Sequence, residues 1–215
     1  MYENEKKEIL KTALQLKEYR LITLSGGNVT VRNDKGHIMV TPSGMLYETM
    51  VPEDIVIIDQ DGNILEGNRK ISVDTEAILY ILKNMPEVNA VIHTHQVFAT
   101  AVGLVEDMLP AAVTTLPNAC LGPVNVAPYS SAASLEMGTH TVKYINDKRA
   151  VILKNHGVIT VGGTLKEALY SAVYLEDVAK TYIMAKAIGT PTILDEEQVG
   201  VAVEKFSPDN YGQNK

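Results

Sequence analysis

The chain has 215 residues, of which 46% are hydrophobic and 21% charged, and its formal net charge is −7. These values predict a single domain over residues 1–215 with a substantial core, and the acidic balance argues against a nucleic-acid or anionic-membrane partner. The single cysteine excludes an intramolecular disulfide, no apolar run is long enough for a membrane span, and the charged first residues differ from a signal peptide, so we expect a cytoplasmic protein.

Hydrophobic periodicity and turn residues divide the chain into interleaved helices and strands. In chain order they predict a helix (3–19), four short strands (29–32, 37–40, 55–59, 63–65), a helix (75–84), a strand (90–94), a helix (96–104), loops and short strands (109–130), a helix (131–147), two strands (150–153, 157–161) and two helices (164–187, 194–205). Thr164 and Glu167 form a capping box, and Asp74 or Thr75 can cap the second helix. This pattern favours a mixed α/β domain with helices on a partly antiparallel sheet.

The strongest functional pattern is a His-x-His pair, His93 and His95, at the end of an apolar strand, with His156 in a distant turn. Residues i and i+2 of a strand point to the same face, so the pair presents two imidazoles in one direction. A third imidazole completes a set that leaves open positions on a catalytic metal. Isolated, satisfied polar residues are the alternative, but this arrangement of three of the five histidines favours a metal site. His37 and His140 are expected at the surface.

Two glycine-containing turns are candidates for anion binding. The Ser-Gly-Gly-Asn turn at 25–28 and the Pro-Ser-Gly turn at 42–44 can direct backbone N–H groups at one anion, although each is also ordinary turn chemistry. Asp74 alone is most simply a helix cap. Beside a metal, its carboxylate could instead move protons or become a fourth ligand.

Together these motifs resemble the class II aldolase/adducin family, in the same order and at comparable spacing over nearly the whole chain. The matching segments are Ser25-Gly26-Gly27-Asn28, Thr41-Pro42-Ser43-Gly44, Ser72-Val73-Asp74, His93-Thr94-His95 and Asn155-His156-Gly157. The resemblance implies a single-domain α/β/α layered fold around a central, largely antiparallel sheet. It also implies a zinc-dependent enzyme that acts on a phosphorylated ketose, typically as a homotetramer with active sites between subunits.

The resemblance assigns roles to individual residues. It implies that His93, His95 and His156 bind one Zn²⁺ and that Asp74 is the catalytic carboxylate. Tyr211, in the C-terminal tail, would reach an active site, expected to be a neighbour's, although the polar composition also permits a disordered tail. The residues implied to hold the phosphate are Ser25, Gly27, Asn28, Ser43, Gly44 and Ser72. Val73 departs from the family, which has a phosphate-binding serine at this position.

Two reactions fit the resemblance: cleavage of a ketose 1-phosphate like L-fuculose 1-phosphate to dihydroxyacetone phosphate and an aldehyde, or 4-epimerisation of L-ribulose 5-phosphate. Asp74 and the 210–213 ending resemble the epimerases, whereas the aldolases have Glu at the first position and Tyr where Thr114 stands. The epimerases have a catalytic Asp where this chain has Asn118, and an amide cannot exchange that proton. We therefore predict a metal-dependent aldehyde-lyase. A non-catalytic adducin-like module, a third possibility, needs neither three histidines nor the acid.

Overall fold

Nine strands form one sheet in the computed structural model, which describes residues 1–205. They are β1 (Gly27–Arg32), β2 (Ile38–Val40), β3 (Val56–Ile58), β4 (Ile64–Glu66), β5 (Ala90–Thr94), β6 (Met108–Leu109), β7 (Val124–Ala127), β8 (Ala150–Leu153) and β9 (Gly157–Gly162). Their order is β4-β3-β2-β1-β5-β9-β8-β7-β6, and all neighbouring pairs are antiparallel except β7 and β8. The expected largely antiparallel sheet is therefore confirmed.

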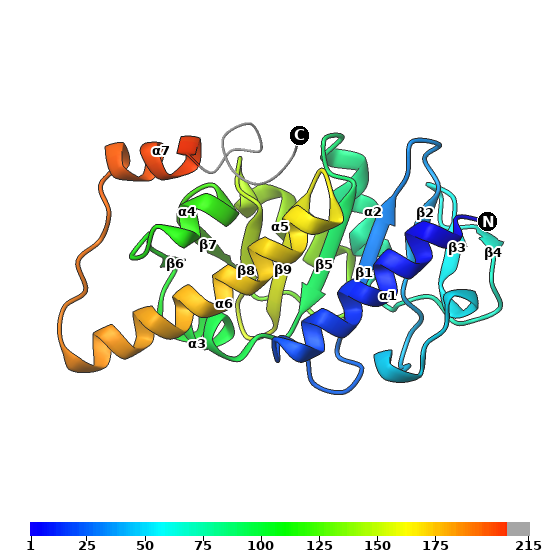
Figure 1. Ribbon diagram of the computed structural model, residues 1–215, viewed down its shortest axis with the longest axis horizontal. Helices are drawn as coiled ribbons and strands as arrows, with labels where there is room; N and C mark the ends of the chain where they lie inside the picture. The colour runs from blue at the N-terminus through cyan, green and yellow to red at the C-terminus, as the bar shows by residue number, and fades with distance from the viewer. Residues whose placement is uncertain (206–215) are drawn as a thin grey trace.

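Helices cover both faces of this sheet. The described helices are α1 (Glu3–Glu18), α2 (Thr75–Asn84), α3 (Val97–Val105), α4 (Thr115–Cys120), α5 (Leu135–Ile145), α6 (Leu165–Ile188) and α7 (Glu196–Lys205). Helices α1 and α6 cross one face, in front of the strands in Figure 1, whereas α2 and α5 pack together on the other. This arrangement confirms the expected α/β/α layers.

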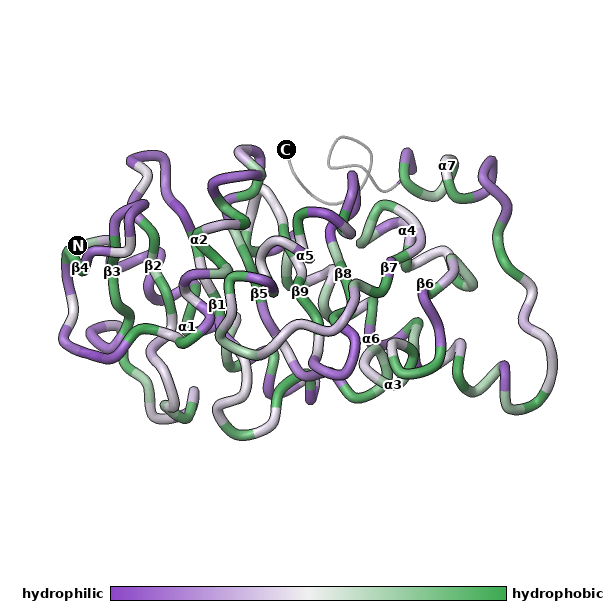
Figure 2. Tube along the Cα trace, turned by 180° about the vertical axis from the view of Figure 1, so that it is seen from behind, coloured by the Kyte–Doolittle hydropathy of each residue, from purple (hydrophilic) through white to green (hydrophobic). Residues whose placement is uncertain are grey.

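The central strand β5 has apolar residues at successive positions, with no alternation between apolar and polar residues over 90–92. Val91 packs into the cluster formed with α2 and α5, whereas Ala90 and Ile92 pack into the cluster formed with α1 and α6. A strand covered on both faces needs apolar residues at successive positions. Figure 2 accordingly shows hydrophobic residues concentrated in the strands and hydrophilic residues in many of the connecting loops.

Most predicted elements are confirmed, including the Thr164–Glu167 capping box at the start of α6. The segment 109–130, expected as loops and short strands, also contains the short helix α4. Its sequence has Pro117 in the first turn, where a missing N–H is tolerated, and its apolar side chains are buried against α6. Helix α5 begins at Leu135 rather than 131, because Ala133 adopts a positive φ of 57°. Among the described residues, no helix is both long and apolar enough to cross a membrane.

Candidate active site

The sheet register brings three distant segments to the carboxyl end of β5. Thr94 pairs with Gly27 of β1 on one side and with Val158 of β9 on the other. The turn at 25–27, the histidine pair and the turn that carries His156 therefore meet at one end of the sheet. Neighbours in an antiparallel ladder lie about 5 Å apart, so side chains from these segments are in direct reach of one another.

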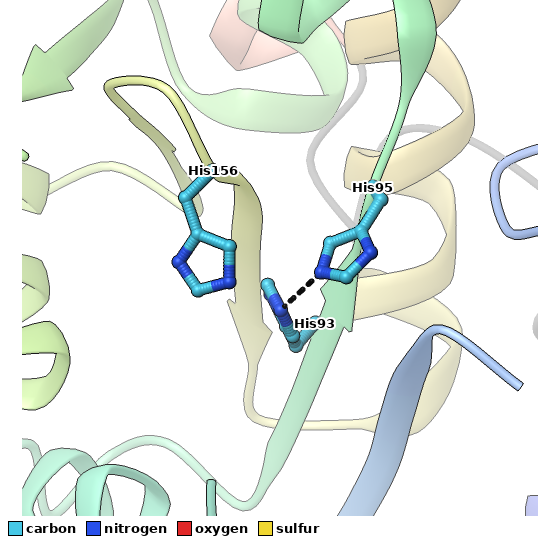
Figure 3. A group of neighbouring side chains, drawn as sticks. All are labelled: His93, His95 and His156. Atoms are coloured by element: carbon cyan, nitrogen blue, oxygen red, sulfur yellow. Dashed lines mark hydrogen bonds between the residues drawn. The ribbon is translucent and has the colours of Figure 1, made fainter. Parts of the chain in front are cut away.

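The three histidines singled out from the sequence form one cluster, as Figure 3 shows. Each offers one ring nitrogen, and these three nitrogens lie within 4.8 Å of one another. His93 continues the Val91 face of β5 and is 1% exposed, His95 is exposed, and His156 is half-buried. The geometry suits a site closed on its buried side and open to a substrate.

Hydrogen bonding and burial prepare these imidazoles to act as ligands. His93 Nδ1 lies 2.9 Å from the carbonyl oxygen of Val158, so Nδ1 donates its proton and Nε2 keeps a lone pair. Nε2 faces His95 Nε2 at 3.0 Å, while His156 Nδ1 is buried without a partner among the described residues. Neutral nitrogens converging in this way fit a divalent metal ion.

The electrostatic environment keeps the cluster neutral at physiological pH. Burial, reinforced by the neighbouring His95 and His156, lowers the pKa of His93 to about 3. Burial also lowers the pKa of His95, against the opposing charge of Asp74. Burial and the charge of His95 lower the pKa of His156, again opposed by Asp74. Because all three shifts are downward, the lone pairs stay available for a metal ion.

Close backbone approach at Gly157 explains why glycine follows the third histidine. A Cβ atom there would lie 2.4 Å from the carbonyl oxygen of Thr94 and 2.9 Å from Cδ2 of His95. Gly26 approaches the same imidazole from the other turn, since a Cβ atom added at Gly26 would lie 3.0 Å from His95 Nδ1. Glycine is thus required at 157 by space, whereas Gly27 is required by its positive φ of 126°.

Asp74 is the N-cap residue of α2, but its carboxylate does not cap the helix. Instead, Asn28 Nδ2 donates to Oδ2 at 2.9 Å, and the backbone N–H of Ala133 donates to Oδ1 at 3.3 Å. The side chain of Thr75 does not cap the helix either, because its Oγ1 donates to the Ser72 carbonyl. The side chains of both proposed caps therefore leave the first-turn N–H groups of α2 without a capping bond. The carboxylate is directed by two distant segments and its charge acts on the histidine cluster.

The proposed phosphate residues also lie close to this end of the sheet. Pro42 forms an isolated bridge with Ile71, and the N–H of Ser43 donates to the Lys70 carbonyl at 2.8 Å, so the second glycine turn lies beside Ser72. Asn28 Nδ2 donates to Ser72 Oγ at 3.3 Å as well as to Asp74, and the buried Oδ1 of Asn28 has no partner among the described residues. The phosphate assignment stays a prediction.

Within residues 1–205, the other residues considered from sequence make none of the contacts described above. Thr114 lines a groove of about 540 Å³ between α4 and α7, and Asn118 lies on α4. Cys120 is fully buried, its thiol pKa is raised to about 12 by burial, and it is not part of the cluster. Tyr211 lies outside the described residues.

The two remaining histidines, His37 and His140, were expected at the surface, but their side chains are less exposed than this expectation implies. Both are half-buried. The Tyr2 hydroxyl lies 2.9 Å from His37 Nδ1, and His140 packs beside Tyr144 on α5. Neither belongs to the metal-type cluster found among residues 1–205.

A comparison with family models matches residues 7–183 to the Class II Aldolase and Adducin N-terminal domain. The chain belongs to this family. The resemblance read from the spaced motifs is therefore confirmed, and with it the nature of the protein as an enzyme of the class II aldolase kind. Class II aldolases depend on a metal, and among residues 1–205 the three histidines form a group that could hold it.

Individual relatives agree with this membership. The 5-deoxy-D-ribulose 1-phosphate aldolase of Bacillus thuringiensis serovar kurstaki is 32% identical over 215 residues, covering 99% of each chain. The L-fuculose phosphate aldolase of Escherichia coli is 31% identical over 207 residues, covering 96% of this chain and 94% of the relative. A solved L-fuculose 1-phosphate aldolase superimposes with a TM-score of 0.89 at 32% identity, over 94% of this chain and 95% of that one.

Sequence reasoning missed several groups that complete the site of this class II aldolase. The Val158 carbonyl and the Ala133 N–H are backbone groups, which no residue type signals. Gln96 directly follows the histidine pair and joins the Thr94 hydroxyl to the Ala172 carbonyl, whereas Glu176, on α6, accepts from the backbone N–H groups of Phe98 and Ala99. The position of Gln96 next to the motif was the only available signal for this pair.

Replacing Gly157 with alanine should disturb the histidine cluster of this class II aldolase. The added Cβ would collide with the Thr94 carbonyl and the His95 ring, so the affinity of the cluster for a divalent metal ion should fall by about tenfold or more. Chelator competition measures this affinity. Gly163→Ala is the matched control, because its Cβ would meet Glu167 Oε2 at 3.4 Å, an ordinary contact. Wild-type affinity in Gly157→Ala would contradict the geometric argument.

The metal-free protein should lose stability as the pH falls from 6.5 towards 5. Unfolded His93 takes up a proton near its ordinary pKa of 6.5, whereas the folded residue stays neutral down to about 3. The unfolded state therefore binds more protons in this window, and His93 alone should lower the free energy of unfolding by up to about 1.4 kcal/mol per pH unit. Urea denaturation at several pH values measures the slope. His93→Gln should show a shallower slope, and an equal slope would contradict the assignment.

Proposed function

We propose that this chain is a zinc-dependent aldolase that cleaves a ketose 1-phosphate, of the L-fuculose 1-phosphate kind, to dihydroxyacetone phosphate and an aldehyde. The observation that carries the proposal is the placement of Asp74. A carboxylate at a helix start is held by Asn28 and Ala133 next to three neutral imidazoles instead of capping its own helix. That combination supplies both metal ligands and a proton carrier, as retro-aldol chemistry requires.

The residues divide the work between metal binding and proton transfer. His93, His95 and His156 would hold the metal, which supplies a Lewis acid that polarises the ketose carbonyl and stabilises the negative charge developing as the carbon–carbon bond breaks. After cleavage, Asp74 would deliver a proton to the substrate carbon that has lost its carbon–carbon bond. In the reverse direction, Asp74 would remove this proton. The hydrogen bonds from Asn28 Nδ2 and Ala133 N–H hold both carboxylate oxygens in place for this transfer.

The phosphate of the substrate would bind where the two glycine turns meet the segment before α2. The hydroxyl groups of Ser25, Ser43 and Ser72 and the backbone of Gly27 and Gly44 would contribute. Asn28 would help by holding Ser72, its neighbour at 3.3 Å. Gly44 supports this placement, because it is exposed and a Cβ atom added there would have no atom within 4 Å. The space beside its backbone is therefore open. Val73, 63% exposed, offers no hydroxyl.

The proposal includes a cytoplasmic homotetramer with active sites between subunits, to which Tyr211 would contribute. The resemblance of the chain to its family supports the assembly. A buried, unpaired cysteine suits a reducing compartment.

Zinc and substrate can be tested together. Protein stripped by a chelator should be inactive, and one equivalent of Zn²⁺ should restore the formation of dihydroxyacetone phosphate from L-fuculose 1-phosphate or 5-deoxy-D-ribulose 1-phosphate. An enzyme-coupled assay for the triose phosphate measures this activity. The unphosphorylated ketoses are the controls for the anion pocket and should bind more weakly. Conversion of L-ribulose 5-phosphate to D-xylulose 5-phosphate, with no triose phosphate from any substrate, would overturn the proposal in favour of the epimerase.

The role of Asp74 predicts a selective loss of turnover. Asp74→Asn removes the proton carrier at nearly constant volume, so kcat should fall roughly 10²- to 10⁴-fold. KM and Zn²⁺ affinity should change only a few-fold. Glu76→Gln, an equal charge change at an exposed position two residues further along, should leave kcat unchanged. A large loss of Zn²⁺ affinity in Asp74→Asn would instead place Asp74 among the metal ligands.

A further inference from the structure

Two polar side chains that contact the segments flanking His95 have no part in the chemistry proposed above: Gln96 and Glu176. Gln96 is 0% exposed, and Glu176 projects from α6 into a half-buried position where partial burial raises the pKa of its carboxyl. Burying an amide or a carboxylate is unfavourable unless its hydrogen bonds are satisfied. Their partners therefore indicate what these residues do.

Gln96 ties the end of β5 to α6. Its Oε1 accepts a hydrogen bond from Thr94 Oγ1 at 2.7 Å, and its Nε2 donates to the carbonyl oxygen of Ala172 at 2.8 Å. Thr94 lies on the face of β5 opposite to His93, because successive strand residues point to opposite faces. The α6 side of the strand is thus fixed by Gln96, while the other side presents the imidazoles.

Glu176 fixes the helix that begins immediately after this segment. Its two carboxylate oxygens accept hydrogen bonds from the backbone N–H groups of Phe98 and Ala99, each at 2.9 Å. These N–H groups lie in the first turn of α3, where helices lack internal acceptors and favour a negative charge. Only Gln96 separates α3 from His95, so the carboxylate defines where the chain leaves the histidine pair.

His95 is the ligand that most needs this support. The buried ring of His93 is oriented by its bond to the Val158 carbonyl. Within residues 1–205, the ring nitrogens of His95 have a hydrogen-bond contact only with His93. His95 is also exposed, and it lies at the point where β5 has ended and α3 has not begun. Its position therefore depends on the backbone on either side.

We propose that Gln96 and Glu176 form a clamp, anchored on α6, that positions His95 for metal binding. The inference rests on the proposed metal function and extends it to two residues that contact neither metal nor substrate. The Gln96 amide holds the Thr94 hydroxyl before His95, and the Glu176 carboxylate holds two backbone N–H groups after it, so together they keep His95 preorganised. Supporting partners of a metal ligand commonly contribute 10- to 100-fold to metal affinity.

The test compares metal affinity with stability in the full-length protein. Gln96→Leu and Glu176→Ala should each weaken Zn²⁺ binding by about tenfold or more in chelator competition. Glu176→Gln keeps one carbonyl acceptor and should recover part of the affinity. Asp177→Asn is the matched control, because it removes one negative charge from an exposed neighbour on the same helix and should stay within twofold of wild type.

A purely structural role would have a different signature. It would lower the free energy of unfolding of the metal-free protein without changing Zn²⁺ affinity, and that result would overturn the clamp. If wild-type protein binds no Zn²⁺, the proposed metal function fails, and amide hydrogen exchange of the metal-free protein tests the clamp separately. The clamp predicts faster exchange over 95–99 in Glu176→Ala with unchanged exchange in β9. Unchanged exchange over 95–99 would overturn it.

Discussion

Strand β5 lies in the middle of the sheet, hydrogen-bonded to β1 on one edge and to β9 on the other. Its pleat sends Val91 and His93 to the α2 and α5 side, and Thr94 to the side of α6. A shift of register by one residue would turn the imidazole of His93 towards α6 and remove it from the cluster. The site therefore depends on the same buried ladder that holds the sheet together.

Burial of that strand also sets the chemistry of the site. A histidine enclosed at the end of a dry strand loses the solvation of its charged form, which explains why the pKa of His93 falls to about 3. The same burial would be unfavourable for an isolated polar side chain, and the Val158 carbonyl offsets it by accepting the Nδ1 proton. The remaining lone pair then points to the cluster, where the exposed His95 and half-buried His156 leave a path for substrate.

Asp74 shows how a local signal can mislead when tertiary contacts are stronger. A carboxylate immediately before a helix usually bonds to the first-turn N–H groups. Here two groups distant in the sequence, on Asn28 and Ala133, bind both oxygens and direct the carboxylate away from α2. The position next to the histidines, rather than helix capping, accounts for an acid at this residue.

The sequence by itself determined the features that depend on local periodicity. The apolar pattern gave β5, the spacing of two in His93 and His95 gave a shared face, and Thr164 with Glu167 gave the start of α6. The order of the motifs was sufficient to identify the family, because each motif carries its own residue types. Helix α4 was missed because its packing against α6, not its propensity, stabilises it.

Only the tertiary structure decided which backbone groups complete the site. The Val158 carbonyl, the Ala133 N–H and the first-turn N–H groups of α3 have no side-chain signature, so no sequence pattern could reveal them. Glu176 lies 81 positions after His95 and approaches its neighbours only because α6 packs across β5. Local sequence fixes which way a side chain points along its own element, whereas the long-range packing of elements fixes what that side chain meets.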